Sequence, residues 1–380
     1  MTTNIAPDRP NEIVVNLHAI GHNLAFLRTL SNGGGRIVAT LKANAYGFGL
    51  VRTAQFLESA GIDGIAVADV ADALTLRSNG IRTDILVHSG NVPTPVLARL
   101  GFEHDLILTV HDWHSAEALA RAGSATRVSV KFDSGLERLG VPAEEVEGLV
   151  ERVRANTPLR VYGLYTHFHA PAGDDLDAYL DWQVERVRAL QARWRSTSLP
   201  RLPVMAASTA VLRRRQDALF DAIDPGSALF GMDNGSAATT HWPTRSALDQ
   251  IATALVQVRE VSRGEFLSQS PFPAEAVRRI GILPIGFRDG FDAAHAGHVL
   301  VRGRPAPILG AASLEVTRID LTGIDDATAG DPVVVVGRQQ AAEIGMEAVL
   351  RRNPSLKGAG LRLMMSLGTA IARRYVYAPH

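Results

Sequence analysis

Eight short apolar runs, alternating with stretches of helical character, constrain the fold of this chain more than any other feature. The runs are Ile37–Leu41, Gly64–Val67, Ile85–Val87, Leu106–Val110, Val128–Lys131, Val161–His167, Val204–Ala207 and Ala222–Ile223. Most are separated by segments rich in Ala, Leu, Arg and Glu, such as Ser115–Ala122 and Ala143–Ala155. This alternation predicts an α/β fold, a (β/α)8 TIM-type barrel. A doubly wound open sheet is the alternative, but no G-x-G-x-x-G follows the first run.

The pattern changes after Met232. The segment Asp233–Arg245 is rich in Ser, Thr, Gly and Asn and indicates a linker. Strand-like runs punctuated by Gly and Pro then follow at Ile251–Val258, Arg279–Ile285, Val299–Val301, Val316–Leu321 and Pro332–Val336. They predict a second, mostly β C-terminal domain, which an early strand at Glu12–Leu17 could join. We divide the chain into a flexible tail (1–10), the barrel (11–236), a linker (237–250) and the β-rich C-terminal domain (251–380).

Composition narrows the class of protein. The 380 residues are 46% hydrophobic, enough for the cores of two domains, and the formal net charge of zero gives no indication of nucleic acid or membrane as a partner. The absence of cysteine excludes disulfides and thiolate chemistry. No metal site is predicted, because Asp289, Asp292, His295 and His298 are better interpreted as a solvated loop. The polar N-terminus and the lack of a membrane-length apolar run predict a cytoplasmic protein.

A lysine follows the first of the eight runs. Residues 37–49 read I-V-A-T-L-K-A-N-A-Y-G-F-G, so the strand delivers Lys42 to its C-terminal tip, where a barrel places its chemistry. The small side chains that follow, beside Tyr46, would allow a flat group to lie against the turn. An amine in a partly apolar pocket loses its proton more easily and can form a Schiff base with an aldehyde cofactor. A solvated strand end is the structural alternative.

The motif K-A-N-A-Y-G-x-G closely resembles the pyridoxal-phosphate lysine motif of alanine racemases, and the resemblance covers nearly the whole chain. It implies pyridoxal 5'-phosphate as cofactor, with Lys42 as the catalytic and cofactor-binding residue and Tyr46 beside the cofactor. It also implies a small-molecule substrate, an amino acid or a related amine. The family is homodimeric and builds each active site from one barrel and the partner's second domain, so a homodimer is expected here.

Two later loops resemble the family's phosphate-binding segments. They read A-A-S-T-A (206–210) after the seventh run and D-P-G-S-A (224–228) after the eighth. Barrels bind phosphate at these loops, where small residues leave room and amides and hydroxyls donate at helix starts. The resemblance therefore gives Ser208, Gly226 and Ser227 cofactor-binding roles. Ordinary helix capping by serine is the structural alternative.

Two other strand ends resemble the family. The segment K-F-D-S-G-L-E-R-L-G (131–140) is similar to K-V-D-T-G-M-G-R-L-G, which implies that Arg138 contacts the cofactor's phenolic oxygen and the substrate carboxylate. A guanidinium fork suits such a carboxylate. Lys131 matches a lysine that some members carbamylate to orient this arginine. The segment T-H-F (166–168) places His167 at the barrel mouth beside the cofactor, whereas His169 is expected to point elsewhere.

The expected reacting groups differ from the family's. Gln269 aligns with the partner-subunit tyrosine that acts as second base, and an amide is a poor proton donor or acceptor near neutral pH. Leu314 and Glu315 replace a Met-Asp pair near the substrate carboxylate. The resemblance therefore implies that Gln269, Leu314 and Glu315 contact substrate. Phe287 replaces a tyrosine that shapes substrate access, and Leu367 replaces one that contacts the cofactor phosphate.

A carboxylate also stands where the family places an arginine against the pyridine nitrogen. The family's R-x-G becomes Asp224-Pro225-Gly226. An arginine keeps that nitrogen unprotonated, whereas Asp224 would raise its pKa and make the ring a strong electron sink for a carbanion at Cα. The structural alternative is that Asp224 only caps the following helix.

The sequence thus predicts a pyridoxal-phosphate enzyme acting at the α-carbon of an amino acid. One interpretation is a racemase or epimerase whose second base has moved to Glu315, His295 or a partner-subunit group. Another is a one-base carbanion enzyme, such as a decarboxylase or aldolase, that uses a protonated pyridine ring. A third is a catalytically inactive cofactor-binding homologue. The missing tyrosine argues against ordinary alanine racemisation.

Overall fold

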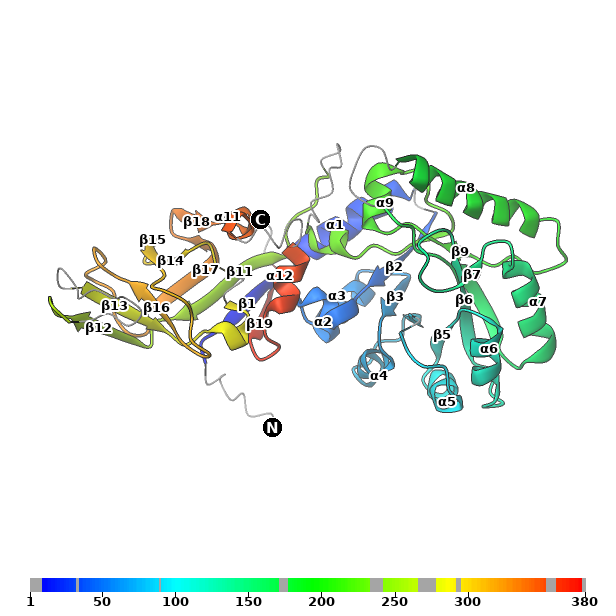
Figure 1. Cartoon of the computed structure of the whole chain (residues 1–380), viewed down its shortest axis with the longest axis horizontal. Helices are drawn as coiled ribbons and strands as arrows, with labels where there is room; N and C mark the ends of the chain where they lie inside the picture. Colours follow the sequence, from blue (N-terminus) through cyan, green and yellow to red (C-terminus); the bar gives the residue numbers. More distant parts are fainter. Residues whose placement is uncertain are drawn as a thin grey trace.

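Parallel strands close into a barrel in the computed structural model, which describes residues 9–31, 34–88, 90–170, 177–232, 242–265, 278–291, 295–352 and 360–377 (Figure 1). In order around the barrel they are β2 (Arg36–Thr40), β3 (Gly64–Val67), β4 (Ile85–Val87), β5 (Leu106–Val110), β6 (Arg127–Asp133), β8 (Arg160–Tyr165), β9 (Val204–Met205) and β10 (Ala222–Ile223). Pairing of β10 with β2 closes the ring, and the short β7 (Val141–Pro142) adds to β6. The predicted eight-stranded barrel is confirmed.

Helices cover the outside of the barrel. They are α1 (Leu17–Leu30), α3 (Leu50–Ser59), α4 (Val70–Ser78), α5 (Pro95–Glu103), α6 (Trp113–Ala120), α7 (Val146–Asn156), α8 (Asp177–Trp194) and α9 (Thr209–Arg214). The helix α7 shows why these segments form: Val146, Leu149, Val150 and Val153 repeat at helical spacing and are all buried. Full burial of one such side chain contributes about 1.5–3 kcal/mol. No described helix is long and apolar enough to cross a membrane.

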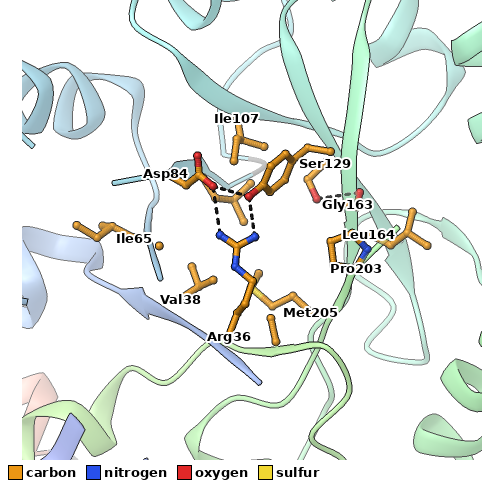
Figure 2. Close-up of a pocket in the computed structure, with 14 residues that line it drawn as sticks. Arg36, Val38, Ile65, Asp84, Ile107, Ser129, Gly163, Leu164, Pro203 and Met205 are labelled. Atoms are coloured by element: carbon orange, nitrogen blue, oxygen red, sulfur yellow. Dashed lines mark hydrogen bonds and ion pairs between the residues drawn. The ribbon is translucent and has the colours of Figure 1, made fainter. Parts of the chain in front are cut away.

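Polar side chains fill the N-terminal end of the barrel. Arg36, at the start of β2, donates to the Tyr162 hydroxyl (2.6 Å) and forms an ion pair with Asp84 (3.2 Å). Arg127, at the start of β6, forms an ion pair with the other Asp84 oxygen (2.7 Å). A small cavity of about 50 Å³, lined mainly by apolar groups including Ile107, lies beside this network (Figure 2). These ion pairs and hydrogen bonds connect β2, β6 and β8 at the end of the barrel that lies opposite the predicted site.

The second part of the chain is built on sheets. One has the order β15-β14-β17-β11-β1-β19 with β18 on β17, and the other the order β12-β13-β16. The strands are β1 (Glu12–Asn16), β11 (Leu248–Ala254), β12 (Gln257–Val261), β13 (Arg278–Leu283), β14 (His298–Val301), β15 (Arg304–Pro307), β16 (Thr317–Asp320), β17 (Pro332–Gln339), β18 (Ala342–Ile344) and β19 (Ala372–Val376). Two helices, α11 (Met346–Arg352) and α12 (Gly360–Ser366), accompany them. The predicted mostly β C-terminal domain is confirmed.

The strand β1 belongs to this second sheet. It pairs antiparallel with β11 and parallel with β19, so the early strand does return to the C-terminal domain. Residues 12–16 therefore lie outside the barrel to which the division at 11–236 assigns them. Arg9, in the predicted flexible tail, is also held, because it forms an ion pair with Asp289 (3.2 Å) and donates to the Glu315 carbonyl (2.9 Å).

Two details of the second part differ from the sequence expectation. The single run predicted at Ile251–Val258 is divided between β11 and β12. The Leu255 amide still donates beside β17, to the Asp331 carbonyl (2.9 Å), whereas the Val256 amide donates to the Ile282 carbonyl of β13 (2.9 Å). The described end of the predicted linker packs on the barrel. There, Trp242 is buried and lies edge-on to Phe26, with ring centroids 5.3 Å apart. Residues 233–241 lie outside the described part of the chain.

Candidate active site

Lys42 opens a left-handed turn directly after β2. The short element α2 (Lys42–Tyr46) contains four residues with φ between 51° and 57°: Ala43, Asn44, Ala45 and Tyr46. Left-handed helical geometry costs about 1–2 kcal/mol for each L-residue, so surrounding contacts must impose this shape. One contact is local, because the Asn44 Oδ1 accepts from the Leu50 amide (2.8 Å). Sequence patterning predicted the strand and the turn but not its handedness.

The Lys42 side chain lies in a cavity of about 220 Å³ at the C-terminal ends of the barrel strands. The lining residues are Lys42, Ala68, His88, Gly90, Lys131, Arg138, Leu139, Tyr165, Thr166, His167 and Asp224. Five residues singled out from the sequence, at or just after the ends of β2, β6, β8 and β10, therefore face one space. The five are Lys42, Lys131, Arg138, His167 and Asp224.

Positive groups crowd this cavity and change the titration of its lysines. Burial lowers the pKa of Lys42, the nearby Arg138 lowers it further, and Asp224 opposes both effects. Burial and Arg138 lower the pKa of Lys131 to about 8. The Lys131 ammonium lies 4.9 Å from the centre of the Tyr165 ring. Both amines consequently lose a proton more readily than an exposed lysine, as nucleophilic or basic lysines require.

Asp224 has a buried oxygen that lacks a hydrogen-bond partner among the described residues. Its Oδ2 lies 3.7 Å from the His167 Nδ1, while Oδ1 is buried and unpaired. The 3-10 helix η2 (Ser227–Phe230) has Gly226 at its N-cap and no side-chain capping bond, so Asp224 does not cap it. A carboxylate buried in this way needs a donor. The N–H of a protonated pyridine ring would satisfy that need.

The two phosphate-type loops lie close together. The Ala228 amide donates to the Thr209 hydroxyl (3.2 Å), which links η2 to the start of α9. The Ser208 side chain makes no capping bond to α9, so capping does not explain this serine. A β-carbon added at Gly226 would lie 2.5 Å from the Tyr46 hydroxyl oxygen, so only glycine fits there. Small side chains, backbone donors and Tyr46 thus form a cradle that fits a phosphate.

Hydrogen bonds fix the loop after β6 that carries Arg138. The Asp133 carboxylate accepts from the amides of Gly135 (3.1 Å) and Glu137 (3.2 Å). The hydroxyls of Ser134 and Thr166 are 3.0 Å apart and connect this loop to the end of β8. These contacts hold the arginine at the cavity, while its own surface stays exposed.

Leu314 and Glu315, two of the residues predicted to contact substrate, lie outside this cavity of their own chain. Leu314 is 52% exposed, and Glu315 forms an ion pair with Arg288; both belong to the second domain and neither lines the Lys42 cavity of its own chain. His295 is buried, and its Nδ1 accepts from the Gly297 amide (3.0 Å). Gln269 lies outside the described residues. No group of three or more metal-type ligands occurs in the described part of the chain.

His88 is a cavity residue that sequence reasoning missed. It follows β4 directly and packs edge-on to Tyr165, with ring centroids 5.5 Å apart. Its Nε2 is buried without a hydrogen-bond partner among the described residues. Burial, and then the charges of Lys42 and Lys131, lower its pKa well below the ordinary value. The available signal was its place immediately after the run Ile85–Val87, at a strand tip.

Known proteins resemble this chain along most of its length. The family model of the alanine racemase N-terminal domain matches residues 15–234, and that of the C-terminal domain matches residues 249–375. An alanine racemase of Sorangium cellulosum (strain So ce56) is 33% identical over 345 residues, which cover 87% of this chain and 89% of the relative.

Solved structures show the same architecture. An alanine racemase from Bacillus anthracis with bound L-Ala-P has a TM-score of 0.85 and 25% identity, covering 97% of this chain and 95% of that one. A histidine racemase from Leuconostoc mesenteroides subsp. sake NBRC 102480 has a TM-score of 0.83 and 26% identity, covering 98% and 99%. Both domain models match in chain order, and the boundary between them falls where the barrel ends and the second sheet begins. This chain is therefore a divergent member of the alanine racemase family, whose enzymes use pyridoxal 5'-phosphate.

Proposed function

We propose that this protein is a pyridoxal-phosphate-dependent isomerase that acts at the α-carbon of an amino acid and uses a non-standard second base. The observation that carries the proposal is the meeting of Lys42, Arg138, His167 and Asp224 in one cavity, next to the glycine-containing loop that Tyr46 packs against. Racemases among the relatives support the isomerase class.

Each residue has a role that its surroundings favour. Lys42, whose pKa is lowered by burial and by Arg138, accepts the proton from Cα on its own face of the substrate. The Arg138 guanidinium binds the substrate carboxylate, because a fork of N–H donors matches two oxygens. Pyridoxal phosphate, when bound, supplies the electron sink for the pair left at Cα. Ser208, Gly226, Ser227 and Tyr46 hold its phosphate end.

The second proton donor is proposed to come from the partner subunit. No described tyrosine aligns with the family's second base, and the residue at that place is Gln269. Glu315 is exposed on the second domain, where a partner's barrel could receive it, and its carboxylate can exchange a proton where an amide cannot. His295 is the less suitable group, since it is buried within its own domain.

A second candidate reaction is favoured by Asp224. A carboxylate with an unpaired buried oxygen stabilises a proton on the ring nitrogen, and a protonated ring accepts electrons more strongly. Such a site can work with one base, as a decarboxylase or an aldolase does. A homologue that binds the cofactor without reacting is the remaining alternative.

Deuterium incorporation separates these reactions. The purified holoenzyme is incubated in deuterated water with L- and D-amino acids, including alanine and histidine, and Cα deuterium, chirality and new products are followed. An isomerase is expected to give exchange with inversion. Exchange with retention, or release of carbon dioxide or an aldehyde, would identify a one-base enzyme, and no exchange would leave only cofactor binding. A K42A variant, expected to be inactive, is the control for Lys42.

A further inference from the structure

We propose that Arg373 and Tyr375, on β19, are positioning residues. They hold the turn of residues 42–49, which carries Lys42, in the conformation in which Lys42 reacts. The proposal rests on the proposed role of Lys42. It extends the active site to a strand of the second domain that touches neither the cavity nor the phosphate cradle. The two side chains lie on β19, and both reach the turn that follows Lys42.

Arg373 ties the turn to the chain segment that leads into β19. Its Nε donates to the Gly47 carbonyl (3.1 Å), while another guanidinium nitrogen donates to the carbonyls of Ile371 (2.6 Å) and Gly368 (3.0 Å). A planar guanidinium presents several donors in fixed directions, so one side chain fixes the distance between these carbonyls. Burial lowers the pKa of Arg373, but its ordinary value is so high that the side chain stays charged.

Tyr375 makes the second tie. Its hydroxyl donates to the Phe48 carbonyl (3.1 Å). A β-carbon added at Gly49 would lie 1.9 Å from that hydroxyl oxygen, and one added at Gly47 would lie 2.3 Å from the Met364 carbonyl oxygen of α12. Gly47 and Gly49 also have positive φ, at 87° and 96° respectively. The turn therefore packs closely against the second domain, against backbone at Gly47 and against the Tyr375 side chain at Gly49.

The left-handed backbone of the turn needs contacts that stabilise it, and Arg373 and Tyr375 supply such contacts. Four consecutive non-glycine residues, from Ala43 to Tyr46, are left-handed, and such backbone persists only where its surroundings over-determine it. The bond from the Leu50 amide to Asn44 is local and moves with the turn. Arg373 and Tyr375 connect the turn to a separate sheet, so they supply a fixed reference that the local bond lacks.

Release of the turn has a chemical consequence at Lys42. The lysine owes its lowered pKa first to burial. A relaxed turn would expose the amine and return its pKa towards the ordinary value of about 10.4, leaving less of the neutral amine at pH 7. The reaction of Lys42 with the aldehyde would then slow, and its pH profile would move upward.

The test compares R373A, R373K and Y375F with R374A. Arg374 is the matched control because it is the next residue on β19, and it forms an ion pair with Glu12 (2.9 Å) without contacting the turn. Two quantities are measured: amide hydrogen exchange across residues 43–49 without cofactor, and the pH profile for borohydride-stable labelling of Lys42 by pyridoxal phosphate.

R373A is expected to speed amide exchange about tenfold and to raise the midpoint of the labelling profile, which slows labelling at pH 7 by about 3–10-fold, as a shift of half to one pH unit would. R373K should fall between R373A and wild type because it retains the charge but not the fork. Y375F removes a single hydroxyl and should give a smaller change in the same direction. R374A should match wild type.

The outcomes distinguish the two proposals. If wild-type Lys42 is not labelled, the proposed function fails, while amide exchange still tests the positioning of the turn. If R373A and Y375F leave both measurements unchanged, or R374A alters them equally, the positioning proposal is wrong. Should R373A not fold, R373K and Y375F decide the question.

Discussion

At the scale of single residues, the cavity combines one carboxylate with several cations. Asp224 sits among Lys42, Lys131 and Arg138, and one of its oxygens is buried without a partner among the described residues. Because an unpaired buried acceptor costs about 1–3 kcal/mol, such an arrangement is more reasonable in a protein that binds a donor there. The chemistry of this site therefore depends on what Asp224 faces.

Replacement of Asp224 tests that dependence. We expect D224N to slow Cα deuterium exchange about 100-fold, equivalent to roughly 2.7 kcal/mol in the barrier, because a neutral amide no longer favours a protonated ring nitrogen. The control is D221N, which lies just before the same strand β10 and pairs with Arg201 (2.7 Å) away from the cavity. Equal exchange rates in D224N and wild type would show that Asp224 does not tune the cofactor.

His88 predicts a pH dependence of stability. Burial and neighbouring positive charges lower its pKa in the folded protein, so below about pH 6.5 the unfolded chain binds a proton that the folded chain does not. Its contribution to the free energy of unfolding therefore falls as pH falls below that value. We expect H88L to gain stability relative to wild type between pH 7 and pH 5, by up to about 1.4 kcal/mol per pH unit.

Urea unfolding of the cofactor-free protein at both pH values measures this difference. The control is H114L, at an exposed histidine of α6. If H88L loses stability relative to wild type as the pH falls from 7 to 5, protonated His88 has a partner in the folded protein and the explanation is wrong.

At the scale of elements, the N-terminal end of the barrel depends on Asp84. Burial alone would raise its pKa, but hydrogen bonds from Tyr162, Arg127 and Arg36 hold the pKa below the ordinary value. The carboxylate joins β2, β6 and β8 through these partners. Its contribution is complete above about pH 4 and is lost as the pH falls through the lowered pKa.

We expect D84N to lower the free energy of unfolding by about 2–3 kcal/mol at pH 7, because two guanidinium groups lose their shared counter-charge. The control is D105N, whose carboxylate pairs with the same Arg127 (3.0 Å) but is 75% exposed, and it should change stability by less than about 0.5 kcal/mol. Thermal or urea unfolding gives both values. Similar losses in the two variants would show that exposure does not separate these ion pairs.

Elements with repeated patterns were predictable, and those that depend on distant contacts were not. All eight barrel strands lie at predicted runs, since parallel strands buried on both faces are continuously apolar. The strand β15, with the sequence R-P-A-P, has no such pattern, and it exists because Val299 and Leu300 pair with Ala306 and Pro305. Arg373 likewise carries no local signal for its contact with Gly47.

The candidate site also combines residues that the sequence predicts with a backbone shape that it does not predict. Lys42, Arg138 and His167 line one cavity, as expected where a motif and a strand end coincide. The left-handed turn of Ala43–Tyr46 could not be predicted, because Ala and Tyr do not favour positive φ and the contacts proposed to hold it, apart from the local bond to Asn44, come from more than 300 residues away.

At the scale of the whole molecule, the second domain leaves apolar side chains uncovered. Phe287 and Leu314 are 53% and 52% exposed, and their loops adjoin, because the Phe287 amide donates to the Ser313 carbonyl (3.0 Å) and the Arg288 amide to the Leu314 carbonyl (3.1 Å). A neighbouring subunit would cover such a patch. This exposure supports the homodimer expected from the family.

We expect a dimer in analytical ultracentrifugation, and we expect L314E to weaken it at least tenfold and to lower activity on dilution, because a carboxylate would be buried against the partner. The control F102E introduces the same charge at a 56% exposed residue of α5 and should leave association unchanged. A fully active wild-type monomer would contradict the shared site.

The pairing of β1 with β19 also governs when the protein can mature during synthesis. About 360 residues separate residues 12–16 from residues 372–376 along the chain, yet these segments lie side by side in one sheet. At about 5–20 residues per second, the edge of β1 waits roughly 20–70 s for that neighbour. A nascent chain can close its barrel in the meantime, but the turn after Lys42 gains its contacts with Arg373 and Tyr375 only once those distant residues have been synthesised.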